Sequence, residues 1–579
     1  MAKKGSQQIS LIPDVLTLNY TLAELPSSQH RAGLAGLAFM VRWLHRSDAW
    51  KQDGAAICEV DNLREHSVTL RINKQGLQAL FNEVYGASWE EKLEYKPRKD
   101  DDTGEVIQPI KTEEVPDKDP KTGKVKIDKK TGQPKTKTAY YYHVVVPRGS
   151  FLCDPQYDRS SDGQKGLWIK LWRDTLYTIL KAKDASRNGF KARANDLTEL
   201  KDVEDVWKNL TNPLSTTKLA GSFYLGAQGN NPENIPFNDH GRHQFLLHFW
   251  FFVAQIYVPT KISSEKDKET GKIRETTDFW GYVIAIPDVI DLFYFCKEFP
   301  ESLEKREIKP FKYLPTECVI DLPLEAALKM TKRLEDQLIQ REAEKSLSDL
   351  VSGIDIIHAH RPKDDTKFIY LGRFLPTRDM ANDYETLRNS LWSPTFRRQR
   401  LLNLVSDKAW YTGFDSLLCT IPYEQTMEND YFLHDVRESF KYEVENMSEE
   451  MDKNEHDGNS LEYSCEKLVL RLVRNYVSKK IKDKYQLEWK KVQATPEEDD
   501  YRKYKAKIAK SAFLDVRSRT EKTDFINYFV STICSVSQYM NESDFENLTR
   551  DLYRKKDENG TEGYEKIRTL TMLALSANG

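Results

Sequence analysis

Cysteine is sparse in this sequence, and its pattern excludes two classes of structure. The seven cysteines are scattered over 579 residues, and no C-x-x-C pair occurs. A disulfide framework and a cysteine zinc site are therefore not indicated. Unpaired cysteines fit a reducing compartment, and residues 1–10 lack the apolar stretch of a secretory signal, so we expect a cytoplasmic protein.

Several enzyme and membrane signatures are also missing. The sequence contains no G-x-x-x-x-G-K-[ST], which argues against a P-loop ATPase or helicase, and neither G-x-G-x-x-G nor G-x-S-x-G occurs. The apolar residues 245–258 are too few to cross a bilayer and include His248 and Gln255. We predict that this run is a buried element and that no membrane is involved.

The net charge is close to zero. The 87 basic and 90 acidic residues give a formal charge of −3, so the chain is not a wholly basic nucleic-acid coat. Any phosphate-binding surface must therefore be a local patch. The length exceeds one ordinary hydrophobic core and predicts about two to four domains.

Hydrophobic periodicity predicts an α+β fold with two parts. Residues 1–430 mix strand-like and helix-like segments and are expected to form a large α/β N-terminal body, in which residues 325–350 form one long helix. Further along, glycine and proline become rare and apolar residues recur at helical spacing. This predicts an all-α helical bundle with one basic side at residues 431–579.

Two charged insertions interrupt the predicted body, at residues 95–138 and 261–274. They contain turn-like pieces such as DDTGE, PKTGK and ETGK, which favour exposed hairpins or partly disordered segments. Both charge signs occur in them, so a solvated surface is the default interpretation. A lysine-lined hairpin that faces DNA is the alternative.

A helix is predicted near the N-terminus. Ser27 and Ser28 follow Pro26 and make a helix start, and Gly33 and Gly36 allow the helix to pack closely against a neighbour.

The first turn of that helix contains three candidates for phosphate or RNA binding, Gln29, His30 and Arg31. Backbone N–H groups point outward in a first turn and attract anions. The alternative is a capped core helix whose polar first turn is solvated.

The stretch 220–253 combines an amide-rich loop with one of the most apolar runs of the chain. Glycines and asparagines permit positive φ, and amide side chains offer paired donors and acceptors. Such a loop on a rigid base suits contact with base edges or phosphates, whereas the alternative is a turn whose amides cap their own backbone. The motif-reading candidates are Gln228, Gly229, Asn230, Asn231 and Asn234, and Arg242 is a further phosphate-binding candidate.

A group of arginines lies beside aromatic residues in segment 387–404. Arg397, Arg398 and Arg400 follow Trp392 and Phe396, a composition that suits contact with RNA or with phosphate groups. Arginine side chains that extend from a packed helix to the surface explain the same pattern equally well.

The histidines raise the possibility of a metal-dependent nuclease or phosphohydrolase. His240 and His243 are three residues apart, and the dipeptide His434–Asp435 is half of a metal-dependent phosphohydrolase pattern. No surrounding pattern supports either set, so this enzyme class remains an alternative.

Two motifs together resemble a known family. ELPSSQHRAGLAGL at residues 24–37 and FYLGAQGNNPENIPFNDHGRHQFLLHFW at residues 223–250 resemble the large subunit of a type I CRISPR interference complex, or Cascade. The resemblance is to subtype I-B, in its myxobacterial-type cyanobacterial branch, and it extends over most of the chain.

The resemblance implies a non-catalytic subunit that needs no cofactor and no metal. The N-terminal body would sit at the guide-RNA handle, check the protospacer-adjacent motif in duplex DNA and help to open the strands. The bundle would support the displaced strand and help to recruit a helicase-nuclease. Implied partners are the guide crRNA, the target double-stranded DNA, the Cascade backbone and handle-capping subunits, and a small subunit.

The resemblance also gives the candidate residues roles. Gln228–Asn234 becomes the best candidate for contact with the motif, Gln29, His30 and Arg31 for the guide handle or a neighbouring subunit, and the arginine group for backbone phosphate. In subtype I-B the bundle is often also made separately from an internal start, for which Met447 or Met451 is favoured over Met427. A protein-only scaffold whose basic bundle side binds acidic partners is a third hypothesis.

Overall fold

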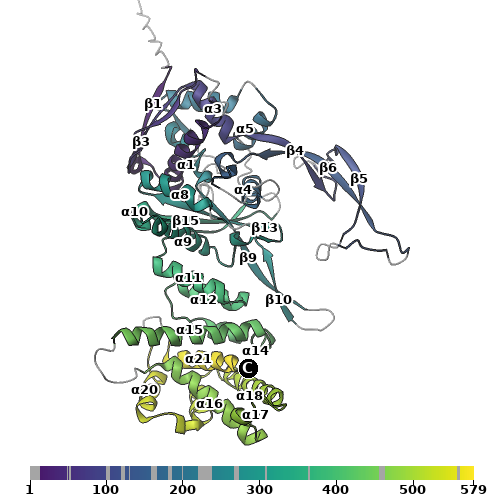
Figure 1. Cartoon of the computed structure of the whole chain (residues 1–579), viewed down its shortest axis with the longest axis vertical. Helices are drawn as coiled ribbons and strands as arrows, with labels where there is room; N and C mark the ends of the chain where they lie inside the picture. The colour runs from purple at the N-terminus through teal and green to yellow at the C-terminus, as the bar shows by residue number, and fades with distance from the viewer. Residues whose placement is uncertain are drawn as a thin grey trace, which may run out of the picture. The chain divides into compact units, whose positions relative to one another are not determined.

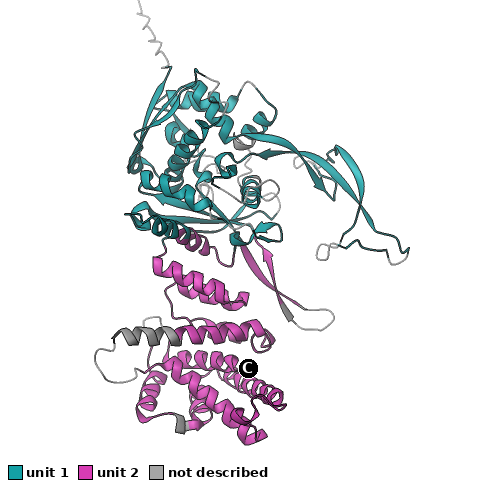
Figure 2. Ribbon diagram, in the orientation of Figure 1, with its two compact units in different colours: residues 1–258, 281–319, 333–375 teal, residues 259–280, 320–332, 376–579 magenta. Residues whose placement is uncertain are grey.

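The computed structural model describes residues 14–47, 50, 54–99, 105–118, 124–128, 131–157, 166–179, 185–197, 200–218, 238–266, 273–304, 306, 309–362, 366–454, 463–556 and 561–578. The chain forms two compact units, each built from segments that are distant in sequence (Figure 2). Unit 1 comprises residues 1–258, 281–319 and 333–375. Unit 2 comprises residues 259–280, 320–332 and 376–579. The boundary predicted at residue 430 falls inside unit 2.

The N-terminal helix of unit 1 is α1 (Ser28–Leu44). It begins where the sequence predicts, because the Ser27 hydroxyl accepts a hydrogen bond from the backbone N–H of His30 and caps the first turn. It lies beside a small antiparallel sheet with strand order β1 (Leu16–Thr21), β3 (Ser67–Ile72) and β2 (Cys58–Asp61). Helix α3 (Lys74–Val84) also packs against α1.

Two glycines allow α1 to approach the backbone of the apolar run. A Cβ atom at Gly33 would lie 2.3 Å from the carbonyl oxygen of Leu246, and one at Gly36 would lie 2.2 Å from that of Phe249. No side chain fits at either position, so the predicted close packing is confirmed. The apolar run itself forms α7 (Gly241–Leu246), η5 (Trp250–Phe252) and the start of β9 (Gln255–Lys266), and its rings are buried as predicted.

An antiparallel sheet forms the second layer of the unit 1 core. Four of its strands in spatial order are β9, β11 (Tyr282–Val289), β15 (Val351–His360) and β16 (Lys367–Phe374), and the short β14 (Val319–Ile320) also pairs with β9. In the middle strand, Ile284 pairs with Ile256 on one side and with Ile357 on the other. Because β11 is buried on both faces and packs against α1, its sequence is an almost continuous apolar run.

The first charged insertion is a β-structure that extends from the rest of unit 1 (Figure 1). Strand β6 (Thr136–Pro147) lies between β4 (Ala87–Glu94) and β5 (Lys111–Pro116), and most side chains of β4 and β5 are exposed. An exposed hairpin was one of the two predicted forms, and the described residues adopt it. Lysines contact tyrosine faces along this arm, as Lys111 does at 4.3 Å from the ring centre of Tyr141.

The remaining elements of unit 1 are short. They are η1 (Leu22–Glu24), η2 (Ser150–Cys153), α4 (Leu167–Thr178), α5 (Ala185–Ala194), α6 (Lys201–Thr211), β7 (Thr216–Lys218), β8 (Asn238–His240), α8 (Leu292–Glu304), β12 (Pro310–Phe311), β13 (Leu314–Pro315), η6 (Thr316–Cys318) and α10 (Leu347–Leu350).

The single helix predicted over residues 325–350 is wrong. Helix α9 (Glu325–Gln340) ends early, and Glu342 adopts a left-handed φ of 50°. A separate helix, α10, then starts at Ser346, whose side chain and that of Asp349 cap the first turn reciprocally. Periodicity alone did not reveal the break, because both helices place apolar residues at compatible spacing.

Unit 2 is mainly helical. It contains the hairpin of β9 with β10 (Ile273–Phe279), which is the predicted insertion at 261–274. Its helices are α11 (Arg378–Ser390), α12 (Pro394–Val405), α13 (Phe414–Thr420), α14 (Glu424–Met427), α15 (Asp430–Asn454), α16 (Cys465–Tyr485), α17 (Trp489–Val492), α18 (Glu498–Ser518), α19 (Lys522–Ser531), η7 (Ile533–Tyr539), α20 (Glu542–Leu552) and α21 (Gly563–Ala577).

The C-terminal helix α21 is the centre of the bundle. Its residues from Ile567 to Ala577 are buried, and α15, α16, α18, α19 and α20 all pack against it.

Of the possible internal starts, Met427 ends α14, whereas Met447 and Met451 lie inside α15. Among the residues that the structure describes, no helix is long and apolar enough to span a membrane.

His248 is a buried neutral group in the core of unit 1. Its side chain is 5% exposed, its Nδ1 is hydrogen-bonded to the hydroxyl of Tyr85, and the ring of Phe81 lies 4.9 Å away. Burial disfavours the charged imidazolium and, together with the nearby Arg193, lowers the pKa of His248 from 6.5 to about 3.

We predict that His248 makes folding sensitive to acid. Below pH 6.5 the unfolded state takes up a proton that the folded state does not, so stability is lost as the pH falls from 6.5 toward 3. In this range, His248 should lower the free energy of unfolding by about 1.4 kcal/mol for each pH unit of acidification. Chemical denaturation of wild type and of His248→Gln between pH 8 and pH 5 measures it.

The variant should lose stability less steeply than wild type across this range. Tyr85→Phe keeps the buried imidazole and should retain the wild-type slope. Equal slopes for wild type and His248→Gln would contradict the assignment.

Candidate nucleic-acid interface

The candidates Gln228, Gly229, Asn230, Asn231 and Asn234 lie outside the described residues. The strands on either side of this segment are described, and they pair with each other. Thr216 of β7 lies opposite His240 of β8, and Lys218 lies opposite Asn238. The chain therefore enters and leaves the segment at neighbouring positions.

Asp239 fixes the end of this strand pair. Its carboxylate contacts Nε2 of His30 at 2.8 Å and Nδ1 of His243 at 3.2 Å, and the second nitrogen of His30 lies 2.7 Å from the Ser27 hydroxyl. Burial raises the pKa of Asp239, but the hydrogen bonds of the two histidines outweigh it and hold the pKa well below its ordinary value. The network joins β8 to the start of α1.

The structure places the four predicted RNA contacts of unit 1 near this network, with different exposure. Gln29 and His30 are 5% and 1% exposed, which favours a structural role. Arg31 contacts the buried carboxylate of Asp288 at 2.7 Å, and Arg242 contacts Glu24 at 2.6 Å. These two arginines retain side-chain exposure of 26% and 44%. They are the members of the set that can still reach a ligand at the surface.

His243 and His434 each contact one carboxylate. His243 contacts Asp239, and His434 lies 3.0 Å from the carboxylate of the adjacent Asp435. Over the described ranges, no group of three or more His, Cys, Asp or Glu side chains is placed to hold a metal ion.

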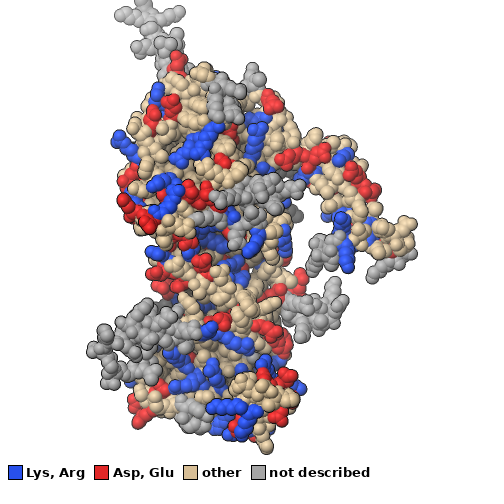
Figure 3. Space-filling model, viewed as in Figure 1, with Lys and Arg blue, Asp and Glu red and all other residues tan. Residues whose placement is uncertain are grey.

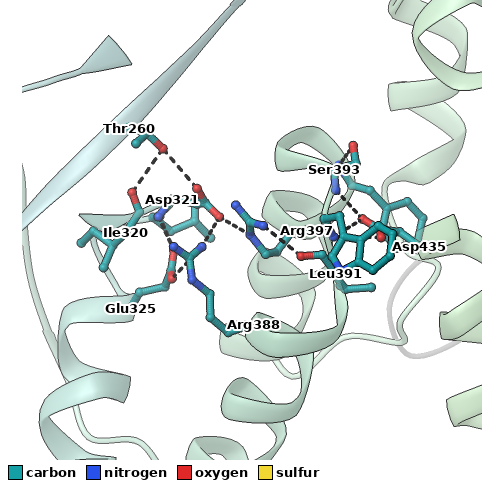
Figure 4. Close-up of polar contacts among 12 residues, drawn as sticks. Thr260, Ile320, Asp321, Glu325, Arg388, Leu391, Ser393, Arg397 and Asp435 are labelled. Atoms are coloured by element: carbon teal, nitrogen blue, oxygen red, sulfur yellow. Dashed lines mark hydrogen bonds and ion pairs between the residues drawn. The ribbon is translucent and has the colours of Figure 1, made fainter. Parts of the chain in front are cut away.

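Two of the three arginines in the predicted phosphate-binding group form internal ion pairs in unit 2. Arg397 donates through Nε to Asp321 at 2.6 Å and through Nη1 to the carbonyl of Leu391 at 2.9 Å (Figure 4). Arg400 is 4% exposed and contacts Glu443 at 2.9 Å. Arg398 is partly exposed and forms no ion pair within the described part of the chain. It is the arginine of the three that is available for a phosphate.

The partner of Arg397 belongs to a buried network. Asp321 also contacts Arg388 and accepts a hydrogen bond from Thr260 at 3.1 Å (Figure 4). Glu325 accepts hydrogen bonds at 2.6 Å from the backbone N–H groups of Asp321 and Leu322, just before α9. Burial raises the pKa of both carboxyls, but the two arginines keep the pKa of Asp321 below its ordinary value, whereas that of the fully buried Glu325 stays raised.

An aromatic group lies just before α12, and although the sequence singled out Trp392 and His434 separately, it did not predict that their rings meet. The rings of Trp392 and His434 stack with centroids 3.7 Å apart and planes at 7°, and Tyr431 lies at 6.2 Å from Trp392. These rings come from segments about forty residues apart, so no local pattern could reveal the group.

On the face in view in Figure 3, basic and acidic side chains are intermixed, which agrees with a local rather than a global binding surface.

Arg397 and Arg398 should behave differently when each is replaced by alanine. Arg397→Ala leaves the buried Asp321 with one arginine fewer and should lower the free energy of unfolding by about 2 kcal/mol. Arg398→Ala removes no described ion pair and should change it by less than about 0.5 kcal/mol.

Urea denaturation of the two variants under one buffer condition measures this difference. A stability loss for Arg398→Ala that equals that of Arg397→Ala would show that the distinction between the two side chains is wrong.

Comparison with known families gives two matches that together span most of the chain. A model described as the type I-B CRISPR Cas8b N-terminal domain matches residues 57–344, and one described as the type I-B CRISPR Cas8b C-terminal domain matches residues 351–578. Comparison with the curated proteins finds no match.

Proposed function

Because the chain belongs to the type I-B CRISPR Cas8b family of large subunits, we propose that it recognises the protospacer-adjacent motif within a guide-RNA-loaded Cascade complex. The observation that supports this most directly is the match to both family domains, in order, over residues 57–344 and 351–578. The role is non-catalytic, since recognition and strand opening need positioned donors, acceptors and charges rather than a reacting group.

The amide-rich segment Gln228–Asn234 reads the motif in this proposal. Its support is the rigid base at its ends: paired strands β7 and β8, and the Asp239 network that joins β8 to α1. A few amide contacts to base edges suffice, since each is worth about 1–3 kcal/mol and the guide RNA reads the rest of the target by base pairing.

The other proposed roles follow the two units. The N-terminal body contacts the guide-RNA handle or a neighbouring subunit, and it helps to open the duplex. The helical bundle supports the displaced strand and helps to recruit the helicase-nuclease. Arg398, which lacks a described ion pair, is the phosphate-contact candidate of its group. The backbone, handle-capping and small subunits complete the set of proposed partners.

The two alternatives predict different chemistry. A metal-dependent nuclease would need His240, His243 or His434 in a three-ligand group, and the described residues bring no such group together. A protein-only scaffold would bind acidic partners through the bundle and would purify without RNA. No specific contact favours either over the Cascade role.

Replacing two amides should remove motif recognition. In the assembled complex, we expect Asn230→Ala with Asn231→Ala to weaken binding to duplexes that contain the motif about 10- to 100-fold. Binding to duplexes without the motif should stay as weak as for wild type. A competition binding assay with both duplexes measures the difference.

Gln493→Ala, at an exposed amide in unit 2, is the matched control and should leave both affinities unchanged. An opened bubble target should partly rescue the double variant, because strand separation is then already done. Equal effects of the double variant on duplexes with and without the motif would refute the assignment.

Arg242 offers a separate test of contact with the guide handle. Its side chain is 44% exposed and pairs with Glu24 at the surface, so Arg242→Ala should lower the RNA-to-protein ratio of the purified complex without unfolding the chain. Glu24→Gln, which removes the same ion pair but keeps the arginine, should retain RNA. An unchanged ratio for Arg242→Ala would exclude this contact.

A further inference from the structure

The large sheet of unit 1 ends in an unpaired edge strand. Strand β16 (Lys367–Phe374) pairs antiparallel with β15, and within the part of the chain that the structure describes no other backbone segment forms hydrogen bonds with it. Alternate N–H and C=O groups of β16 therefore point away from the sheet. Such a row of donors and acceptors is a template for an added strand.

This edge strand exposes large apolar side chains. Ile369, Tyr370 and Leu371 are 39%, 36% and 37% exposed, and Leu375, directly after the strand, is 38% exposed. The segment Phe368–Gly372 contains neither a charged residue nor a proline. Consecutive apolar side chains on an open edge favour association with another chain, because burying them and pairing the backbone both lower the free energy.

The two three-stranded sheets of unit 1 have edges of a different kind. Strands β4 and β5 each contain at least three charged residues, and β5 ends in a proline. Strand β2 has four residues, two of them acidic, and the apolar side chains of β1 are half-buried or buried. Charge, proline and short length are the features that protect an edge from pairing. The middle of β16 has none of them.

The regular part of β16 is long enough to hold another strand. Its last five residues pair in register with β15, from Tyr370 opposite His358 to Phe374 opposite Ile354. A bulge follows at Ile369, which has no residue opposite it, and pairing resumes at Phe368. Five regular positions match the usual length of a strand in a folded protein.

One end of this edge has uncompensated positive charge. Lys367 is exposed and forms no ion pair among the described residues. Arg361 directly follows His360, the residue opposite Lys367, and its buried Nε has no hydrogen-bond partner. At the other end, Arg373 is already paired with the carboxylate of Asp288. A strand added to this edge therefore gains from an acidic side chain where it passes Lys367.

A second copy of the chain fits this edge poorly. In a two-fold antiparallel pairing centred on Tyr370, Lys367 of one copy would lie opposite Arg373 of the other, three residues to either side of the centre. Like charges at opposite positions destabilise a strand pair. The charge pattern favours a different protein chain with acidic residues.

We infer that β16 is a docking edge for an extended segment of another protein, which adds a strand to the sheet. The added segment has apolar side chains beside Ile369, Tyr370 and Leu371 and an acidic one beside Lys367. Main-chain hydrogen bonds supply the geometry, and the side chains supply the choice of partner. This contact goes beyond motif recognition and does not depend on it.

A strand-forming peptide tests this inference on the purified full-length chain. The probe is a labelled ten-residue peptide of alternating valine and threonine with a glutamate at each end, and fluorescence anisotropy measures its binding. Lysines in place of the glutamates should weaken binding about 5-fold. Two central prolines should abolish it, because proline lacks the backbone donor. Hydrogen exchange should slow in residues 367–374 when the peptide binds and stay unchanged in β5.

Substitutions on the strand and a matched control locate the contact. Leu371→Lys should weaken binding of the glutamate peptide about 10-fold, whereas Leu514→Lys, at a leucine of α18 that is 39% exposed, should bind like wild type. Lys367→Glu should reverse the preference, so that the lysine peptide binds more tightly than the glutamate peptide. This reversal is a gain of binding and cannot result from misfolding.

Four results would overturn the inference. They are no binding of the glutamate peptide, equal binding of the proline peptide, unchanged hydrogen exchange in residues 367–374, and a wild-type dimer in light scattering that Leu371→Lys converts to a monomer. The last would assign the edge to a second copy of the chain. The assay contains no RNA and no DNA, so its failure leaves the motif experiment intact, and failure of that experiment does not alter this one.

Discussion

The hydrogen bonds to Asp239 are the interaction on which the proposed recognition depends. This carboxylate belongs to β8, the strand that follows the amide-rich segment, and His30 and His243 contact it from two different helices. Because Gly33 and Gly36 let α1 lie against the backbone of Leu246 and Phe249, both histidines come from one tightly packed region. A loop that reads base edges needs such a base, since positional freedom at its ends would spread its amides over many orientations.

In unit 2, ion pairs with carboxylates determine which arginines can still bind a ligand. Asp321 and Glu443 hold Arg397 and Arg400, so those arginines stabilise the fold. Arg398 has no such partner among the residues described. A chain with a net charge of −3 can therefore still have a locally positive surface, because its carboxylates form ion pairs with some basic side chains and not with others.

The sequence predicted local features well and pairings poorly. Ser27 as a helix cap, Gly33 and Gly36 as packing positions and the buried run after residue 245 all follow from short patterns, and the structure confirms them. The arginine group was ambiguous because its partners lie 76 residues from Arg397 and 43 from Arg400. The stacking of Trp392 on His434 was missed for the same reason: Trp392 precedes α12 and His434 belongs to α15, so no spacing within one helix encodes the contact.

Sequencing of the RNA that copurifies with this chain tests the central claim most directly. The tagged chain would be expressed with its genomic neighbours and purified under native conditions. The account predicts a single length class of RNA that shares a common 5′ segment, as expected for a guide held at its handle. Purification without RNA, accompanied by a bound divalent metal and by cleavage that is lost when His240, His243 or His434 is replaced, would contradict it.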